Sequence, residues 1–162
     1  MSDFQQTVNV KLAGGIPGEF YDASPSRSMA YVVASNGSAA PTYGYAFTKV
    51  AGENTAKPGL AEPGAIFVGI ATNPKEAMAY ASLAATMSVP DGKTVGLTTF
   101  GRIFVISENA AAEGQAAFFQ NTTGKISAFD AGSTQSGYTE IKNSKFIKGG
   151  SAGELAVLEL GD

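Results

Sequence analysis

The chain has 162 residues and a net charge of −3, a length that suits one domain or one domain with an extended arm. Hydrophobic residues make up 44% and charged residues only 15%, so the chain can build a core but has little charge to place on its surface. Scattered basic residues argue against a nucleic-acid partner, and the lack of a long apolar run argues against a membrane partner. The absence of Cys and His removes disulfides and the commonest catalytic base.

The low charge content leaves two ways to cover the surface, namely small neutral residues or another protein chain. The first residues lack the basic and apolar regions of a secretory signal. We therefore expect the protein to be made, and either kept or assembled, in a cytosol.

The first 27 residues are predicted to form an N-terminal arm, and residues 28–162 a β domain. Within the arm, residues 5–12 alternate apolar and polar side chains, as in a half-buried strand. Glycines and a proline in residues 14–18 end this run. Two interpretations stay open: an edge strand followed by a loop, or an arm that adds a strand to a neighbouring subunit.

Strand patterns follow in residues 28–34 and 43–50. In the second run, Tyr43, Tyr45 and Phe47 share one face. Three rings at this spacing fit a platform on which a sugar or a base stacks. The pattern favours the other interpretation, in which the rings form one face of the core.

The chain then passes through a predicted loop into a predicted buried strand. Residues 51–64 are polar and rich in Gly and Pro, which predicts a surface loop. Residues 65–71 are continuously apolar, which predicts a strand covered on both faces. Residues 73–87 fit a helix, because Asn73 can cap it and Pro74 suits its first turn. The same residues also alternate with period two, so a strand stays open as the second choice.

The clearest strand signal lies in residues 89–129, where four short runs alternate with turns. Gly101 interrupts one of these runs, which predicts a bulge or a bend there. Residues 121–124 predict a hairpin turn that ends on a glycine. A polar tail follows in residues 130–153, and an apolar run in residues 154–160 predicts a final buried strand.

These patterns predict about eight to ten short strands separated by Gly and Pro turns. The expected fold is mainly β: a small β-barrel or sandwich of short antiparallel strands, with an extended N-terminal arm and at most one short helix. We expect its core around residues 65–129 and 154–160.

Motifs that carry chemistry are incomplete in this chain. Residues 149–153 match the G-x-S-x-G pattern, but no His is present to activate Ser151. Residues 92–94 resemble the end of a phosphate-binding loop, yet Met87 stands where that loop needs a glycine. The acidic residues fall singly in predicted loops. The sequence therefore predicts no enzyme, with no catalytic, cofactor-binding or metal-binding residues and no cofactor.

Several short motifs occur in a fixed order along most of the chain: residues 4–9 with 15–20, 67–71, 87–92 with 94–97, 101–105, 114–119 with 123–126, and 146–160. In order and spacing they resemble the head decoration (cement) proteins of tailed bacteriophages. The match is weakest in residues 52–64 and 131–143.

The resemblance implies a structural virion protein that binds the outer surface of an icosahedral capsid and stabilises contacts between major capsid protein subunits. Its implied partners are the major capsid protein and copies of itself, as a homotrimer, with assembly in the host cytoplasm and a final place on the capsid exterior. No nucleic acid or membrane partner is implied, and no catalytic residue is carried over.

The arm supplies all the residues that we expect at the capsid or subunit interface, through backbone pairing and apolar anchors. They are Phe4, Gln5, Gln6, Val8, Val10, Leu12, Ile16 and Phe20. The alternative function is a small β binding module that recognises a surface glycan, for example on a phage fibre, through Tyr43, Tyr45 and Phe47.

Overall fold

The computed structural model describes residues 14–73 and 88–161, and its described part is built from strands and loops without a helix. The predicted strand at residues 5–12 and the helix-or-strand segment after Asn73 lie outside the described residues. The strands are β1 (Arg27–Val33), β2 (Ala46–Lys49), β3 (Thr55–Pro58), β4 (Ile66–Ala71), β5 (Thr94–Ile106), β6 (Ala116–Gln120), β7 (Ile126–Phe129), β8 (Tyr138–Glu140), β9 (Ser144–Lys148) and β10 (Leu155–Leu160). The prediction of a mainly β fold is confirmed.

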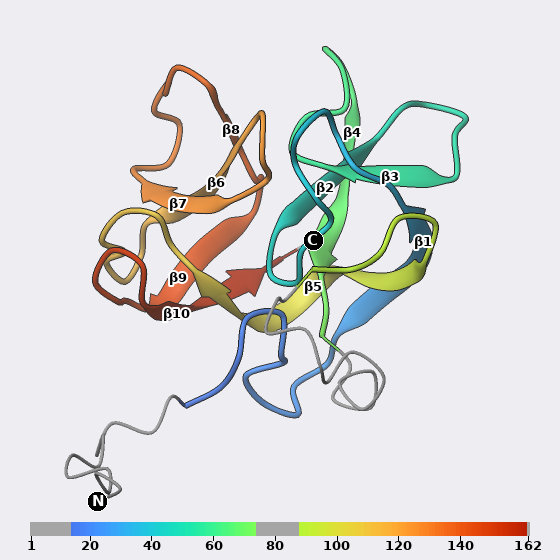
Figure 1. Ribbon diagram of the computed structural model, residues 1–162. Coiled ribbons are helices and arrows are strands. Elements are labelled where there is room, and N and C mark those ends of the chain that lie inside the picture. Colours follow the sequence, from blue (N-terminus) through green and yellow to red (C-terminus); the bar gives the residue numbers. More distant parts are fainter. Residues whose placement is uncertain (1–13, 74–87, 162) are drawn as a thin grey trace, which may run out of the picture.

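Five strands close into a barrel in the order β1-β3-β2-β4-β5, with β5 pairing back onto β1 (Figure 1). The pairs are antiparallel except that β1 and β3 run parallel, with Val32 opposite Thr55. Apolar side chains from all five strands fill the interior. They are Val33, Phe47, Ala56, Val68, Ala71, Val95 and Leu97, joined by Val89 from the loop before β5. Closure removes most sheet edges, which otherwise attract other strands.

Strand β5 is much longer than the others and belongs to both halves of the molecule. Its first half pairs with β1, and from Gly101 onward it pairs with β10. Gly101 has φ of +123°, and a Cβ there would lie 2.9 Å from the Cβ of Ser26. The β1 ladder shifts register beside it, between Arg27 and Ser28. The expected irregularity at Gly101 is therefore present, within one continuous strand rather than between two runs.

The second half of the molecule stacks two small sheets (Figure 1). One sheet extends from β5 through β10 to β9, and the other has the order β7-β6-β8. Side chains from both sheets share one core, which includes Phe119, Ile126, Phe146 and Leu158. The ring of Phe119 stacks on Phe67 of β4 at 6.2 Å between centroids, which joins this half to the barrel.

The predicted surface loop at residues 51–64 contains a strand, so that prediction was wrong, and the polar tail at residues 130–153 contains two strands. The segment 51–64 holds β3, where Ala56 is fully buried in the barrel. The tail 130–153 holds β8 and β9, where Phe146 is buried. These strands have only three to five residues, and their stability comes from neighbouring strands and the core rather than from a local pattern.

Candidate interaction surface

Residues 14–26, which we call the strap, run antiparallel to the second half of β5. The Gly18 N–H donates to the Phe104 carbonyl at 2.8 Å, and the Phe104 N–H donates to the Glu19 carbonyl at 2.8 Å. Further along, the Tyr21 N–H donates to the Arg102 carbonyl at 2.9 Å. These bonds tie the strap to its own subunit, so it forms a fixed base for the residues that precede it.

Six of the eight predicted interface residues lie outside the described part of the chain, and Ile16 and Phe20 lie in the strap. Ile16 is half-buried in a turn in which its carbonyl accepts the Glu19 N–H at 3.1 Å. Phe20 bridges to Ile103 through its backbone and keeps 36% of its surface exposed. Both side chains lie in the described part of the arm, and their contact with a partner stays a prediction. The division into arm and β domain at residue 27 also stays a prediction.

An apolar contact between aromatic rings also joins the strap to β5. The Tyr21 ring meets the Phe104 ring edge-on, with centroids 5.4 Å apart. Gly15 lies so close that a Cβ there would overlap the Phe104 ring. A glycine at this position therefore lets the strap lie flat on β5.

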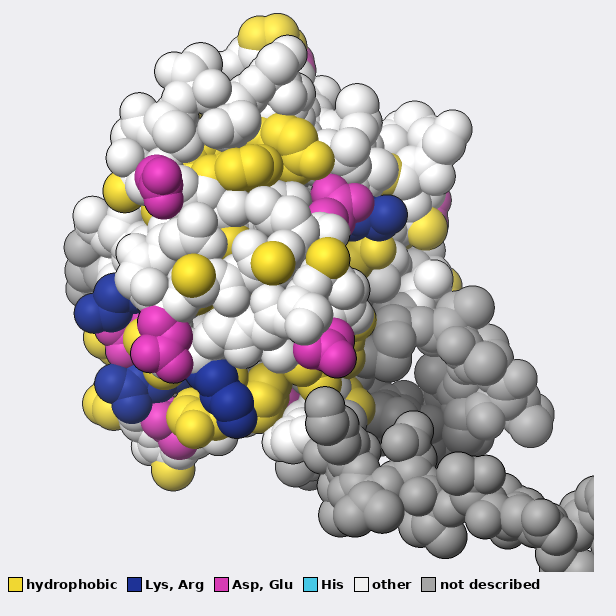
Figure 2. All heavy atoms as spheres, turned by 90° about the vertical axis from the view of Figure 1, so that its left-hand side faces the viewer, with side chains coloured by type: hydrophobic (Ala, Val, Ile, Leu, Met, Phe, Trp, Pro, Cys, Tyr) yellow, Lys and Arg dark blue, Asp and Glu magenta, His cyan; other side chains and the backbone are white. Residues whose placement is uncertain are grey.

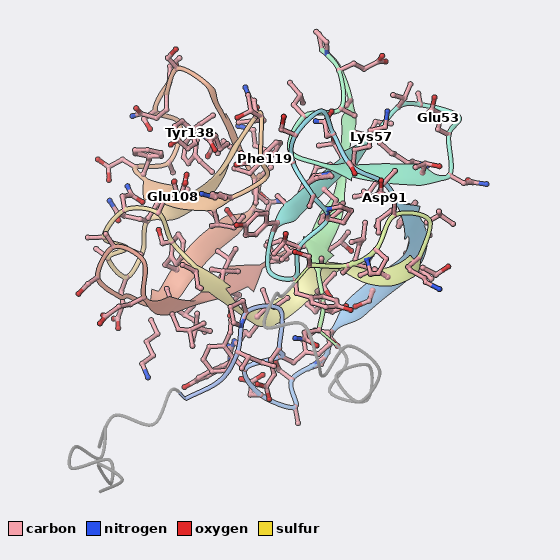
Figure 3. The ribbon with its side chains drawn as sticks, viewed as in Figure 1. Glu53, Lys57, Asp91, Glu108, Phe119 and Tyr138 are labelled. Carbon is pink, nitrogen blue, oxygen red and sulfur yellow. The ribbon has the colours of Figure 1, made fainter. Side chains whose placement is uncertain are left out.

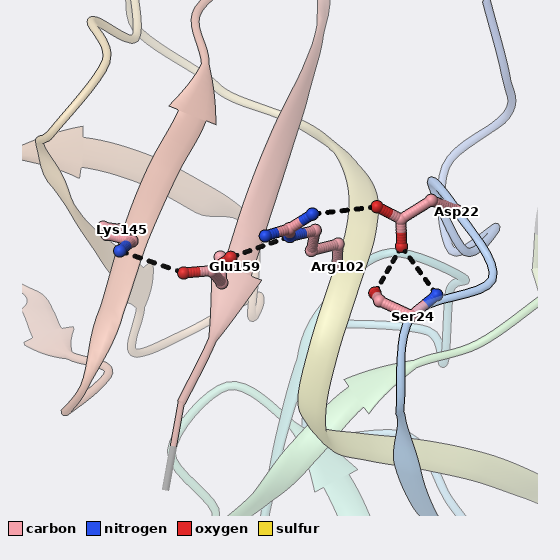
Figure 4. Close-up of polar contacts among 5 residues, drawn as sticks. All are labelled: Asp22, Ser24, Arg102, Lys145 and Glu159. Atoms are coloured by element: carbon pink, nitrogen blue, oxygen red, sulfur yellow. Dashed lines mark hydrogen bonds and ion pairs between the residues drawn. The ribbon is translucent and has the colours of Figure 1, made fainter.

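Charged side chains link the strap to three strands (Figure 4). Arg102 of β5 donates to Asp22 of the strap at 3.0 Å and to Glu159 of β10 at 2.7 Å. Lys145 of β9 pairs with the other oxygen of Glu159 at 3.0 Å. Asp22 also accepts hydrogen bonds from the backbone N–H and the hydroxyl of Ser24.

These hydrogen bonds and ion pairs lower the pKa values of Asp22 and Glu159. Hydrogen bonds from Ser24, and then from Arg102, lower the pKa of Asp22. Hydrogen bonds from Arg102 and Lys145 lower the pKa of Glu159. All these charges are paired and partly exposed, so the network fastens surface elements together and offers no free acid or base for catalysis.

Strand β1 presents a second exposed surface, which the sequence pattern did not single out. Met29 is 56% exposed and Val32 is 40% exposed, although both lie in a strand of the barrel. Ser28 and Ala30 are also exposed. The alternation in residues 28–34 correctly predicted the strand, but it gave no sign that residues 27–30 are exposed on both faces.

The surface is poor in charge, as the composition predicts. On the face in Figure 2, few side chains are charged, and they stand singly or in small groups of both signs. Large apolar side chains are exposed on the strap and on β1, β4 and β5: Phe20, Tyr21, Met29, Val32, Ile66 and Ile106. Such a surface can form a large contact area with a partner while desolvating few charged groups.

The three aromatic residues of the glycan interpretation do not form an exposed platform. Phe47 is buried in the barrel core. Tyr43 and Tyr45 are half-buried and pack against that core. Burial raises the pKa of Tyr43. The prediction that this face belongs to the core is confirmed.

No catalytic constellation is assembled among the described residues. Ser151 lies between β9 and β10, so the helix that a nucleophile elbow requires does not follow it. Glu108 lies in a different half of the molecule from Glu53 and Asp91 (Figure 3). Within residues 14–73 and 88–161, no group of three acidic side chains is placed to hold a metal, and no helix is long and apolar enough to cross a membrane.

Two shallow grooves on the described surface also lack paired acids. The first, of about 290 Å³, is lined by Ser24, Pro25, Phe100, Gly101, Arg102, Glu159, Leu160 and Gly161. Its one carboxylate, Glu159, is held by Arg102 and Lys145. The second, of about 430 Å³, is lined by Asn36, Gly37, Ser38, Ala39, Leu60, Asn121, Thr122 and Thr123, none of which is charged. The charge-poor surface and its exposed apolar side chains are therefore suited to contact with another protein.

Comparisons with known proteins agree with this conclusion. The family model described as "Structural cement protein (E217 gp24/Pam3 gp6)" matches residues 4–161. Among solved structures, a chain from the capsid of the Myoviridae phage XM1 superimposes with a TM-score of 0.68. The two sequences are 16% identical, and the alignment covers 99% of each chain, which shows a shared fold. No curated protein matches the chain.

Proposed function

Because the chain belongs to the structural cement protein family, we propose that it is a non-enzymatic virion protein that binds the outer surface of an icosahedral phage capsid. There it stabilises the contacts between subunits of the major capsid protein. The match of the family model to residues 4–161 carries this proposal, since it spans both the arm and the β domain.

The closed barrel and the two stacked sheets support such a role physically. A rigid head loses little conformational freedom when it binds, so more of the contact energy remains as affinity. Its charge-poor surface limits the cost of removing water from charged groups. Many copies that each make a modest contact would together stabilise the shell, because linked contacts act as one multivalent attachment.

The arm is the segment that we expect to make the decisive contact. Val8, Val10 and Leu12 alternate with polar residues, so an extended arm offers one apolar face and a line of backbone donors and acceptors. The strap is bonded to the second half of β5 on either side of Phe20, so the chain that follows the arm is fixed to the strand shared by both halves of the molecule. Ile16 and Phe20 extend the same contact surface onto the head.

Deleting residues 1–12 tests the proposal. The shortened protein should keep its folded β domain, because the core residues all follow residue 27. It should lose most of its occupancy on empty phage heads, measured by co-sedimentation and gel densitometry. A matched control removes only Met1, Ser2 and Asp3 and should bind heads as the full chain does.

A pair of point variants refines the same test. Val10→Asp places a charge on the apolar face of the arm and should lower occupancy, whereas Asn9→Asp changes the polar face and should not. Full occupancy of heads by the protein without residues 1–12 would show that the arm is not the attachment.

The oligomeric state and the position on the shell belong to the same proposal. We propose a homotrimer that sits on the capsid exterior and is added during assembly in the host cytoplasm. Light scattering of the purified protein measures its mass, and electron microscopy of decorated heads measures its position. The glycan-binding alternative has lost its structural basis, because Phe47 is buried and Tyr43 and Tyr45 pack on the core.

A further inference from the structure

We propose that the outer edge of β1 receives the N-terminal arm of a second copy of the chain as an added strand. This inference rests on the proposed function only in taking the arm as the contact segment. It goes further by naming the surface that accepts the arm.

The free edge follows from how the barrel closes. On one side, β1 pairs with β5 along its whole length, from Arg27 to Val32. On the other side, β3 pairs only with Val32 and Val33. Residues 28–31 therefore have no strand on their outer side within the part of the chain that the structure describes.

The hydrogen bonds around β5 show which backbone groups point outward. Thr72, just after β4, donates its N–H to the Gly96 carbonyl at 2.8 Å, so the backbone of Gly96 points toward β4 and away from β1. Ala30 stands opposite Gly96, which makes them a non-hydrogen-bonded pair. The N–H and carbonyl of Ala30 consequently point away from β5, and those of Ser28 follow by alternation.

Two further bonds confirm this alternation. The Val33 N–H donates to the Lys93 carbonyl, and the Val33 carbonyl accepts the Gly92 N–H, so Val33 bonds toward the β5 side. Even-numbered residues of β1 must then point the other way. Among the described residues, the outward-facing N–H and carbonyl groups of Ser28 and Ala30 have no backbone partner.

The side chains along this edge also suit a partner strand. Exposed edges are normally protected by charge, by proline or by a covering element. The sequence from Ser28 to Val32 is Ser-Met-Ala-Tyr-Val, with no charge and no proline. Met29 and Val32 are largely exposed apolar side chains beside the open backbone groups. This combination is typical of a site for strand addition.

The arm has the complementary properties. Residues 5–12 show strand alternation and contain no proline, and a single strand in water needs a neighbour to be stable. The 13 residues before Gly14 can span about 43 Å when extended, which is enough to leave one subunit and reach another. Each copy carries one donor arm and one acceptor edge, so copies can link head to tail and close into a ring.

The absence of Cys from the chain gives a direct test. One preparation carries Ala30→Cys, and the others carry a single Cys placed in turn at each of residues 7–12, which covers both faces and several registers. Mixing the two kinds in mild oxidant should give a mixed disulfide dimer, identified by mass spectrometry. The control replaces Ala30→Cys by Ile66→Cys, an exposed apolar position on β4, and should give only background.

Proline provides an independent measurement. Ala30→Pro removes an N–H that points outward, so the barrel keeps its own hydrogen bonds while strand addition loses a donor. Self-association, followed by light scattering over a concentration series, should weaken at least several-fold. Ala30→Ser keeps the N–H and should associate as the unmodified protein does.

Three outcomes would overturn the inference. The first two are a mixed disulfide that does not exceed the Ile66→Cys background and an Ala30→Pro variant that associates as the unmodified protein does. The third is a disulfide that forms only within one chain, at low concentration, in a variant that carries both Ala30→Cys and a Cys in the arm. These experiments use purified protein without heads, so they are separate from capsid binding. If copies crosslink but the protein does not bind heads, the capsid proposal fails and strand exchange stands. If the protein binds heads and no copies crosslink, strand exchange fails and the capsid proposal stands.

Discussion

Strands β1 and β10 both pair antiparallel with β5, but they differ in what lies on their other side. β10 pairs with β9 along most of its length, and Val157 and Leu158 are fully buried. On its side away from β5, β1 pairs with a strand only at Val32 and Val33, and Met29 remains 56% exposed. At one end β5 pairs with β10, which has a further strand beside it, and at the other end it pairs with β1, whose outer edge is open.

β10 therefore contributes mainly to the stability of the fold, whereas β1 offers groups that a partner could bind. β10 contributes apolar area that is already removed from water, so it stabilises the monomer. β1 contributes open backbone groups and exposed apolar side chains, which gain little until another strand covers them. The predictions below compare the two strands, beginning with the largest expected effect.

The largest contrast is between truncations of apolar side chains. Leu158→Ala removes a fully buried side chain from the core and should lower the free energy of unfolding by about 2–5 kcal/mol. Met29→Ala removes an exposed one and should change it by less than about 0.5 kcal/mol. Urea unfolding of both variants measures the difference. Equal losses would mean that β1 is as much a part of the finished fold as β10.

The junction between the two halves of β5 should be the next most sensitive point. Gly101 combines a positive φ with close approach to Ser26, so Gly101→Ala should lower the free energy of unfolding by about 1–3 kcal/mol. Gly92 also has a positive φ, but a Cβ there meets nothing among the described residues. Gly92→Ala should therefore cost only about 1 kcal/mol. A smaller loss at Gly101 than at Gly92 would show that the junction relaxes freely.

The sequence predicted β1, β2, β4, β5, β6, β7 and β10 from local signals. Residues 65–71 are continuously apolar, and Val68 and Ile70 indeed contribute to the two different cores. The hairpin at 121–124 closes as its glycine indicates, with φ of +78° at Gly124. Where apolar pattern and turn residues agree, a single sequence is enough.

Strands β3, β8 and β9 depend on partners that are distant in the sequence. β3 contains Lys57 and Pro58 and has no strand pattern of its own, yet it pairs with both β1 and β2. The parallel pairing of β1 with β3 and the closure of the barrel are likewise decided by non-local contacts. The open edge of β1 is a consequence of where β3 ends, so residues 28–34 could not reveal it.

The smallest expected effect concerns the ion pairs that tie β10 to β5, β9 and the strap. Hydrogen bonds in the folded protein hold the pKa values of Glu159 and Asp22 below their ordinary range. A carboxylate with a lowered folded pKa stabilises the protein above its unfolded pKa of about 4, and this contribution is lost as the pH falls through the folded pKa. The free energy of unfolding should therefore be nearly constant from pH 7 to about 5 and decline below that range.

Glu159→Gln isolates the part of this decline that belongs to β10. The variant keeps the size of the side chain but cannot titrate, so its unfolding free energy should fall less steeply in acid, and added salt should narrow its difference from the unmodified protein at pH 7. Glu113→Gln is the matched control, because Glu113 is an exposed loop residue without an ion-pair partner among the described residues. Urea midpoints measured at a series of pH values give the slopes. If the Glu159→Gln curve runs parallel to that of the unmodified protein, the network adds no stability, and the advantage of β10 over β1 comes from backbone pairing and burial alone.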